Sequence, residues 1–393
     1  MIGNFKTNYS VRMGLLYAAW FAVLGIQMPF WPLWLKVQGL GSSQIGLALM
    51  IALMAKVVAG PLFAQFADNF GIRRNLIVAL GWASLASFAL FTLADSVATI
   101  LIITALTACL FPSIIPLADN LLLLHAREHG LHYGRVRLWG SIAFIAVSIS
   151  GGAIVAAYSE NIVLWLVLAA LMLVVVAAIL APKESGAAAR RAPGYSLTSR
   201  MRAIFKDRRL VLLLASAGAI QASHGIYYVF GTISWREAGF SDPVIGTLWA
   251  LGVAAEVVVF AVIGGSGGRV RTSQLLLLSS IAGMVRWSFL PVTHNVFLIG
   301  ALQCLHGLTF GATHLAAVQF LARHVPIELS ATAQSLYSAL SMGLIVAGSV
   351  AMSGFLYESF GVTAYWAMAA ICMIGFYLAL ALRASQDPKS DGP

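Results

Sequence analysis

Residues 64–74 read AQFADNFGIRR, and they lie where one long apolar run of the chain gives way to the next. The runs on either side cover residues 43–67 and 75–94. Each is long enough to cross a bilayer as a helix, which takes roughly 20 apolar residues. A short charged connection between two such runs predicts a helical hairpin in a membrane, because only helices and closed barrels satisfy their backbone groups in lipid.

The same stretch carries a pattern of charge that suggests a second role. Gly71 permits a tight turn, and Asp68, at a helix end, can pair with an arginine across the loop. Such an ion pair would hold one conformation and break in another. We therefore predict a conformational latch formed by Asp68, Gly71, Arg73 and Arg74. A turn whose two arginines only anchor the helix ends is the alternative.

The composition extends the membrane prediction to the whole chain. Of its 393 residues, 60% are hydrophobic and 10% are charged, whereas a soluble domain carries about a quarter charged residues. We predict an all-α membrane protein with twelve transmembrane helices, near residues 12–36, 43–67, 75–94, 98–124, 135–157, 162–181, 210–235, 242–264, 272–291, 295–322, 331–356 and 361–382. The net charge of +10 then belongs to loops at a lipid surface, and no nucleic-acid partner is expected.

The distribution of positive charge predicts the orientation. Twenty of the 24 Lys and Arg residues fall at the termini, in the even-numbered loops or at the helix ends beside them. Lys36 and Arg236 fall on the opposite side, and Lys56 and Arg286 lie inside spans. Positive charge concentrates on the cytoplasmic side of membrane proteins. We therefore expect both termini in the cytoplasm of a bacterium whose inner membrane holds the protein.

The chain also divides into two similar halves. Six spans occupy residues 1–181, a basic stretch at 182–209 predicts a cytoplasmic linker, and six more spans occupy residues 210–393. The halves echo each other: Trp34 matches Trp235, and at an offset of 200 residues Gly39, Ile45 and Gly46 match Gly239, Ile245 and Gly246. Duplicated halves of this kind can rock about a site at the midplane of the membrane. Two pseudo-symmetric six-helix bundles are therefore expected.

Ionisable residues inside spans are costly in a bilayer, so each is a candidate for function. The charged ones are Lys56, Asp119, Arg137 near the start of its span, Glu256 and Arg286, and the histidines are His224, His306 and His314. The alternative for each is a contact between helices that only fixes their packing. For the histidines, a neutral core ring is equally plausible.

One predicted group of site residues lies on the fourth and fifth spans. Pro112 and Pro116 can kink the fourth span just before Asp119. Arg137 opens the fifth span, where its guanidinium could pair with that carboxylate and keep donors for a ligand. Phe144 lies two helical turns further along the same face and could offer a ring for stacking.

The charges inside the spans also suggest a substrate. Three cations stand against two carboxylates, so the carboxylate of an organic anion would balance the surplus, whereas a neutral sugar would not. Lys56 could instead lose its proton when buried. A transporter coupled to protons would also need a titrating group, and for that role we prefer Glu256, then Asp119, and then His306 and His314.

The 64–74 loop resembles the signature loop of the major facilitator superfamily. The matching residues are Asp68, Gly71, Arg73 and Arg74, while Ala64 and Asn69 depart from the pattern. Within the superfamily, the fourth and fifth spans resemble the lactose permease family at Asp119, Arg135 and Arg137. That family also has counterparts of Glu256, Arg286 and His306, but its proton-carrying carboxylate three residues after the histidine is Thr309 here.

The resemblance is strongest to the phenylpropionate permease branch and covers nearly the whole chain, in residues 29–36, 133–141, 223–228, 251–256, 285–287 and 314–317. It implies proton-coupled symport, by alternating access, of a small aromatic carboxylate such as 3-phenylpropionate. The substrate-binding residues predicted together with it are Lys56, Asp119, Arg137, Phe144, Tyr227, Tyr228 and Arg286.

Several other functions remain open at this stage. A sugar or nucleoside symporter and a drug exporter would share the fold, and a sensor would bind a ligand without moving it. A membrane-embedded enzyme is not expected, because the sequence lacks the zinc-protease and P-loop motifs. We expect a monomer in the lipid bilayer, with no metal and no cofactor.

Overall fold

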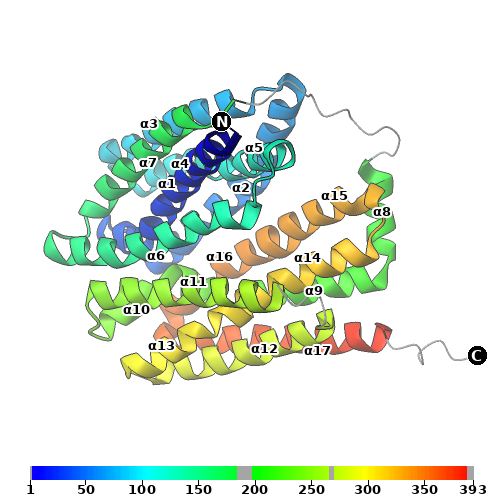
Figure 1. Cartoon of the computed structure of the whole chain (residues 1–393). Coiled ribbons are helices and arrows are strands. Elements are labelled where there is room, and N and C mark those ends of the chain that lie inside the picture. The colour runs from blue at the N-terminus through cyan, green and yellow to red at the C-terminus, as the bar shows by residue number, and fades with distance from the viewer. Residues whose placement is uncertain (1, 184–196, 265–269, 387–393) are drawn as a thin grey trace, which may run out of the picture. The chain divides into compact units, whose positions relative to one another are not determined.

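The computed structural model describes residues 2–183, 197–264 and 270–386, and within these ranges the regular structure is helical (Figure 1). The described residues contain eleven helical stretches long and apolar enough to cross a membrane. The last stretch, Thr332–Ser385, has 54 residues. At 1.5 Å per residue it would reach about 80 Å, enough for two crossings. Because the chain turns inside it at Gly361, where φ is +57°, this stretch holds the eleventh and twelfth predicted spans.

The first six spans are formed by seven α-helices: α1 (Ile2–Val37), α2 (Ser42–Phe70), α3 (Arg73–Ala89), α4 (Val97–Leu110), α5 (Ile114–His129), α6 (Tyr133–Ala157) and α7 (Ile162–Leu180). The fourth span consists of α4 and α5, which are joined by a 3₁₀ turn, Phe111–Ser113. Pro112 lies inside that turn. The interruption predicted from the prolines is therefore present, and it places Asp119 on the second piece, α5.

The remaining helices are α8 (Leu197–Lys206), α9 (Arg208–Ala222), α10 (Gly225–Glu237), α11 (Asp242–Gly264), α12 (Thr272–Phe289), α13 (Val296–Cys304), α14 (Thr313–His324), α15 (Ile327–Leu336), α16 (Ile345–Phe360) and α17 (Tyr365–Gln386). The seventh span combines α9 and α10. Two π-helical segments, Gly307–Ala312 and Tyr337–Leu344, lie within the tenth and eleventh spans. Such segments are frequent at functional sites.

The two sets of six spans repeat one packing pattern. Helix α1 packs against α6 and α7, and its counterpart α9 packs against α16 and α17. Helix α3 packs against α7, just as α12 packs against α17, beside which it runs in Figure 1. The first span thus meets the fifth and sixth, and the seventh meets the eleventh and twelfth.

The sequence echo between the halves is also an echo in backbone geometry. Gly39 and Gly239 have φ of +88° and +89°, a region that favours glycine. The N–H of each glycine bonds to the carbonyl three residues before it, at 3.0 Å in both cases. The next residue bonds five residues back, at 3.2 Å in the first half and 3.0 Å in the second. The same helix-ending motif therefore closes α1 and α10.

By their internal contacts the residues form two compact units. The first contains Met1–Arg191 and Thr232–Ala250, and the second contains Ala192–Gly231 and Leu251–Pro393. This division departs from the predicted sequence halves, because the end of α10 and the start of α11 join the first unit. Residues 184–196 of the predicted linker lie outside the described residues. The later part of that linker is the helix α8, whose Ile204 belongs to the hydrophobic core of the second unit.

Candidate functional site

In the first unit, Asp119 is held by two tyrosines. The hydroxyl groups of Tyr17 on α1 and Tyr133 on α6 both donate hydrogen bonds to Asp119 Oδ1, the second at 2.8 Å. Tyr17 is fully buried and Asp119 is half-buried. A carboxylate with two hydroxyl donors is partly satisfied without an ion pair.

Arg137 lies near the two tyrosines that hold Asp119. Within the described part of the chain it forms no ion pair with Asp119, and Tyr133, one turn earlier on α6, makes the contact to Asp119 instead. The exposed guanidinium of Arg137 lies over the ring of Phe21, with its central carbon 5.7 Å from the ring centroid. Its donors therefore remain available to a ligand.

The aromatic ring nearest to Arg137 differs from the one the sequence suggested. Phe144 is only 3% exposed, and its backbone lies against Gly25 of α1. Phe21 is half-buried and packs against Gly140, where any side chain would overlap its ring. Phe21 is thus the ring presented beside the guanidinium, and a role for Phe144 in binding stays a prediction.

Lys56 lies in the middle of α2 with an exposed side chain. Within the described residues it forms no ion pair. Val58 and Leu62 are exposed apolar side chains of the same helix, 59% and 60% accessible. At 100° per residue they point roughly 160° and 120° away from Lys56. The lysine is therefore exposed on a different face from the apolar side chains that suit lipid.

The second unit has its own polar site, centred on Arg286 of α12. This side chain is fully buried. Its Nη1 lies 2.9 Å from His306 Nδ1 and 3.3 Å from Thr309 Oγ1, and its Nη2 donates to Gln303 Oε1 at 2.6 Å. The guanidinium also lies over two rings, with its central carbon 4.6 Å from the Tyr227 centroid and 4.4 Å from that of Trp287. These contacts compensate much of the desolvation of the cation, while its Nε has no hydrogen-bond partner among the described residues.

His306 connects this arginine to a carboxylate. Its Nε2 lies 2.9 Å from Glu256 Oε1 on α11. Gln303, one turn before the histidine, donates to the Tyr227 hydroxyl at 2.9 Å. Tyr228 is half-buried, and its ring lies edge-on to that of His306, with centroids 6.4 Å apart. Four predicted site residues, Tyr227, Glu256, Arg286 and His306, are therefore joined in one network.

Thr309 and His224 complete that network. The Thr309 hydroxyl lies 3.0 Å from His224 Nε2, and His224 Nδ1 lies 3.1 Å from the carbonyl of Gln221. Both side chains are fully buried. Thr309 sits in the π-helical segment that follows His306. The residue at which the lactose permease pattern fails is therefore a member of the network.

His314 lies further along the same span, and its Nδ1 is 3.2 Å from the Tyr337 hydroxyl. Its ring stacks on Phe310, with centroids 6.4 Å apart. Its part in proton coupling stays a prediction.

The predicted latch residues lie at the junction of α2 and α3. Gly71 has φ of +62° and ends α2. Asp68 pairs with the Nη2 of Arg73, whose side chain is buried while that of Asp68 is 53% exposed. Arg74 donates to the carbonyl of Ile179 near the end of α7. The geometry supplies the ion pair, and its role as a latch stays a prediction.

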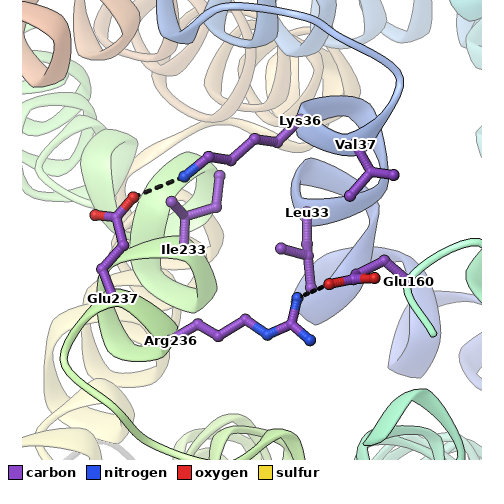
Figure 2. Close-up of a pocket in the computed structure, with 7 residues that line it drawn as sticks. All are labelled: Leu33, Lys36, Val37, Glu160, Ile233, Arg236 and Glu237. Carbon is purple, nitrogen blue, oxygen red and sulfur yellow. Dashed lines mark hydrogen bonds and ion pairs between the residues drawn. The ribbon is translucent and has the colours of Figure 1, made fainter. Parts of the chain in front are cut away.

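A second set of ion pairs, here named the α1–α10 ion cluster, consists of Lys36, Glu160, Arg236, Glu237 and Asp242. Lys36 Nζ lies 2.7 Å from Glu237 Oε1, while Arg236 pairs with Glu160 and, at 3.3 Å, with Asp242. Figure 2 shows Lys36 and Glu237 reaching toward each other, and Arg236 toward Glu160. The apolar side chains of Leu33, Val37 and Ile233 line the same pocket.

Glycines bring the backbones together beside this cluster. A side chain at Gly152 of α6 would overlap with the carbonyl of Asp242, and one at Gly246 of α11 would overlap with the carbonyl of Ser148. The start of α11 is therefore in direct contact with α6, which explains why Thr232–Ala250 belongs to the first unit.

Two contact residues were missed by sequence reasoning. Tyr133 lies inside the motif that contains Arg137. Its position one helical turn from that arginine could have indicated a contact with Asp119. Gln303 lies three residues before His306 on the same helix face. Neither carries a charge, so neither stood out as costly in a membrane.

Comparison with known proteins agrees with this architecture. A model of the MFS_1 like family matches residues 10–368. A protein of Escherichia coli described as a probable 3-phenylpropionic acid transporter is 30% identical over 367 residues, which are 93% of this chain and 96% of that one. The maltose permease of Geobacillus stearothermophilus is 25% identical over 95% of this chain and 94% of its own. The crystal structure of the nucleoside transporter NupG superimposes with a TM-score of 0.80 at 15% identity, covering 96% of this chain and 98% of that one.

Together with the repeated six-span packing, these matches establish the fold of the major facilitator superfamily. The chain belongs to the MFS_1 like family and is a multi-pass membrane transporter.

Proposed function

We propose that this transporter carries a small aromatic carboxylate, such as 3-phenylpropionate, together with protons by alternating access. Uptake would run into a bacterial cell, across an inner membrane with both chain termini in the cytoplasm. The name of the Escherichia coli relative supports this substrate class. The maltose permease supports a neutral sugar as the second candidate.

The main support for a carboxylate substrate is the unequal balance of charges in the two units. In the second unit Arg286 is matched by Glu256 through His306. In the spans of the first unit, Lys56 and Arg137 stand against Asp119 alone, and within the described residues neither cation forms an ion pair. A substrate carboxylate would supply the missing negative charge, and a sugar would not. Both cations are exposed. An isolated charge facing lipid is costly, so exposed cations inside a span are expected to face a site that water or a ligand can reach.

The aromatic part of the substrate has a matching surface in the first unit. Phe21 is half-buried and lies directly beside Arg137. A carboxylate bound to the guanidinium would place an attached phenyl ring near that side chain. Ring pairs at stacking distance add about 0.5–1.5 kcal/mol beyond the area they bury. This contact would favour aromatic over aliphatic acids of equal charge.

The α1–α10 ion cluster suits the role of an outer gate. Lys36 and Arg236 are the two basic residues on the predicted outer side, and both are paired with carboxylates. Alternating access needs contacts that close one end of the transporter and break when it opens. The partly exposed ion pairs and glycine contacts of this cluster are suited to that exchange.

Uptake into proteoliposomes tests the proposed substrate and its coupling together. The purified protein would be given 3-phenylpropionate, a short aliphatic acid, maltose and a nucleoside, each with and without an imposed pH gradient. We expect accumulation of the aromatic acid above its equilibrium level only when the gradient is present. We also expect competition by aromatic acids and none by maltose.

Two outcomes would contradict the proposed function. Accumulation of maltose or of the nucleoside in place of the acid would overturn the substrate assignment. Accumulation of the acid that is independent of the pH gradient would overturn proton coupling. Empty liposomes control for passive entry of the protonated acid.

A further inference from the structure

The direction of each hydrogen bond around Arg286 follows from one property of arginine, which donates but never accepts. Arg286 Nη1 lies 2.9 Å from His306 Nδ1, so that nitrogen must be the acceptor. A neutral imidazole then carries its proton on Nε2, 2.9 Å from Glu256 Oε1. A doubly protonated His306 would point one N–H at another. The geometry therefore fixes His306 as a neutral donor to Glu256.

The same reasoning fixes His224. Its Nδ1 lies 3.1 Å from the Gln221 carbonyl, which only accepts, so Nδ1 carries the proton. Its Nε2 must then accept from the Thr309 hydroxyl at 3.0 Å. With its proton used in this way, the Thr309 oxygen is an acceptor for Arg286 Nη1 at 3.3 Å.

One alternative arrangement reverses part of this chain. The Thr309 hydroxyl could donate to the carbonyl of His306, 3.4 Å away, with His224 doubly protonated. That would place a second cation beside Arg286, although His224, Thr309 and Arg286 are all fully buried. The cost of an extra desolvated charge rules against this arrangement.

We propose that Thr309 and His224 are positioning residues, which hold Arg286 against His306 so that the imidazole stays neutral and the transported proton resides on Glu256. This inference rests on the proposed proton coupling. Besides one another and Arg286, the titratable and charged groups facing the two histidines are Glu256 on α11 and Tyr227 and Tyr228 on α10, while Tyr365 and Cys372 on α17 lie near Arg286.

The lactose permease family has a carboxylate where this chain has Thr309, and the proposed positioning role explains this difference. A carboxylate at this position would form an ion pair with Arg286 and would compete with Glu256 for the proton. Threonine offers the arginine an acceptor without charge, and its hydroxyl donates a hydrogen bond to His224. Among the described residues of this network, Glu256 is then the carboxylate that can bind the proton.

Nitrogen-15 NMR of the histidine-labelled, full-length transporter tests the hydrogen-bond directions without any transport assay. Among the ring signals of its 8 histidines, those lost in His306→Gln and in His224→Gln are assigned to these two residues. We expect His306 protonated on Nε2 and His224 on Nδ1, both neutral between about pH 5 and 8. A doubly protonated His306, or either ring in the opposite tautomer, overturns the proposal.

A transport experiment tests the consequence. Thr309→Val keeps the side-chain shape but removes the hydroxyl, and Thr309→Ser restores it. With Thr309→Val we expect proton-driven accumulation to fall roughly tenfold, as for one lost bond to a charged group. Exchange of internal for external acid should persist, the pH profile should shift, and Thr309→Ser should recover most of the loss.

The two proposals fail in different ways. An unchanged pH profile and accumulation in Thr309→Val overturn the positioning role, whatever the substrate. Absence of pH-driven uptake by the wild-type protein overturns the proposed function, while the NMR result still decides the tautomers.

Discussion

The two units place their intramembrane charges in opposite environments. In the second unit Arg286 is fully buried, and its guanidinium is bonded to His306, Thr309 and Gln303. In the first unit Arg137 and Lys56 are exposed, and the carboxylate of Asp119 is bonded to tyrosines. Both Nη atoms of Arg286 are hydrogen-bonded within the protein, whereas Arg137 and Lys56 have donors available for a ligand.

This difference suggests a division of labour between the units. A buried ion network is costly to break, because removing one partner strands the others without solvent. Such a network is suited to holding a proton on a defined group. Exposed cations with unused donors are suited to a ligand that must bind and leave. We therefore propose that the second unit carries out proton coupling and that the first binds the carboxylate.

The largest effect is expected from Glu256→Gln, which removes the proposed proton site but keeps an acceptor for His306 Nε2. Accumulation driven by a pH gradient should be abolished, whereas exchange of internal for external acid should continue. Proteoliposomes loaded with unlabelled acid measure both. Asp119→Asn is the matched change in the first unit. If it abolishes accumulation while Glu256→Gln does not, the division of labour is reversed.

The second comparison is between two arginines. Arg286→Gln leaves buried acceptors unsatisfied and should lower the free energy of unfolding by about 3 kcal/mol. Arg137→Gln removes an exposed side chain and should leave thermal stability unchanged. It should instead raise the KM for the aromatic acid roughly tenfold or more, the value of a hydrogen bond to a charged group. Thermal unfolding in detergent and uptake kinetics separate the two effects.

A stable Arg286→Gln protein would mean that the second network is not held by its arginine. A destabilised Arg137→Gln protein would mean that the first site also contributes to packing. Either result would remove the contrast between the units.

A smaller effect is expected from Lys56→Met, which removes the surplus cation. The KM for the carboxylate should rise about tenfold, and binding of an uncharged amide analogue should be unaffected. Val58→Met is the matched control, since it places the same side chain two residues away on the face that suits lipid. Unchanged carboxylate uptake in Lys56→Met would contradict the charge argument.

Much of the fold was predictable, because hydrophobic runs and repeated turn residues are local signals. The spans, the break at Pro112 and the repeat of Gly39 at Gly239 follow from such signals. The site was less accessible to prediction. Costly charges such as Glu256 and Arg286 stood out, but their partners Thr309, Gln303 and Tyr133 are uncharged and common in any span. The orientation of Phe144, which is buried, depends on the close approach of α6 to Gly25, and no single-sequence pattern encodes that contact.

The smallest predicted effect concerns the α1–α10 ion cluster, whose partly exposed pairs contrast with the buried network of Arg286. Such pairs contribute only about 0–1 kcal/mol each. Glu160→Gln should therefore open the proposed outer gate by no more than about fivefold. The rate at which a membrane-impermeant maleimide labels Ile233→Cys, a position 2% exposed in this structure, reports the opening. Cys304→Ser removes the exposed native thiol from the background.

The pH dependence of that labelling tests the same pair in the protein with native Glu160. The backbone N–H of Glu160 lowers the pKa of its carboxyl group below the ordinary 4.5. Burial opposes this shift, and the Arg236 guanidinium lowers the pKa further. The pair therefore stabilises the closed gate fully above about pH 4.5 and loses that contribution as the pH falls through the lowered pKa. Because maleimide reacts with the thiolate, whose fraction falls with pH, each rate is divided by that of the exposed Cys304 in the protein with native Ile233 at the same pH. This ratio should be constant near neutral pH and should rise only in acid, and Glu160→Gln should remove the acid rise. A rise between pH 7 and 5 would instead assign gating to a histidine. The Glu160–Arg236 pair would then not control the outer gate.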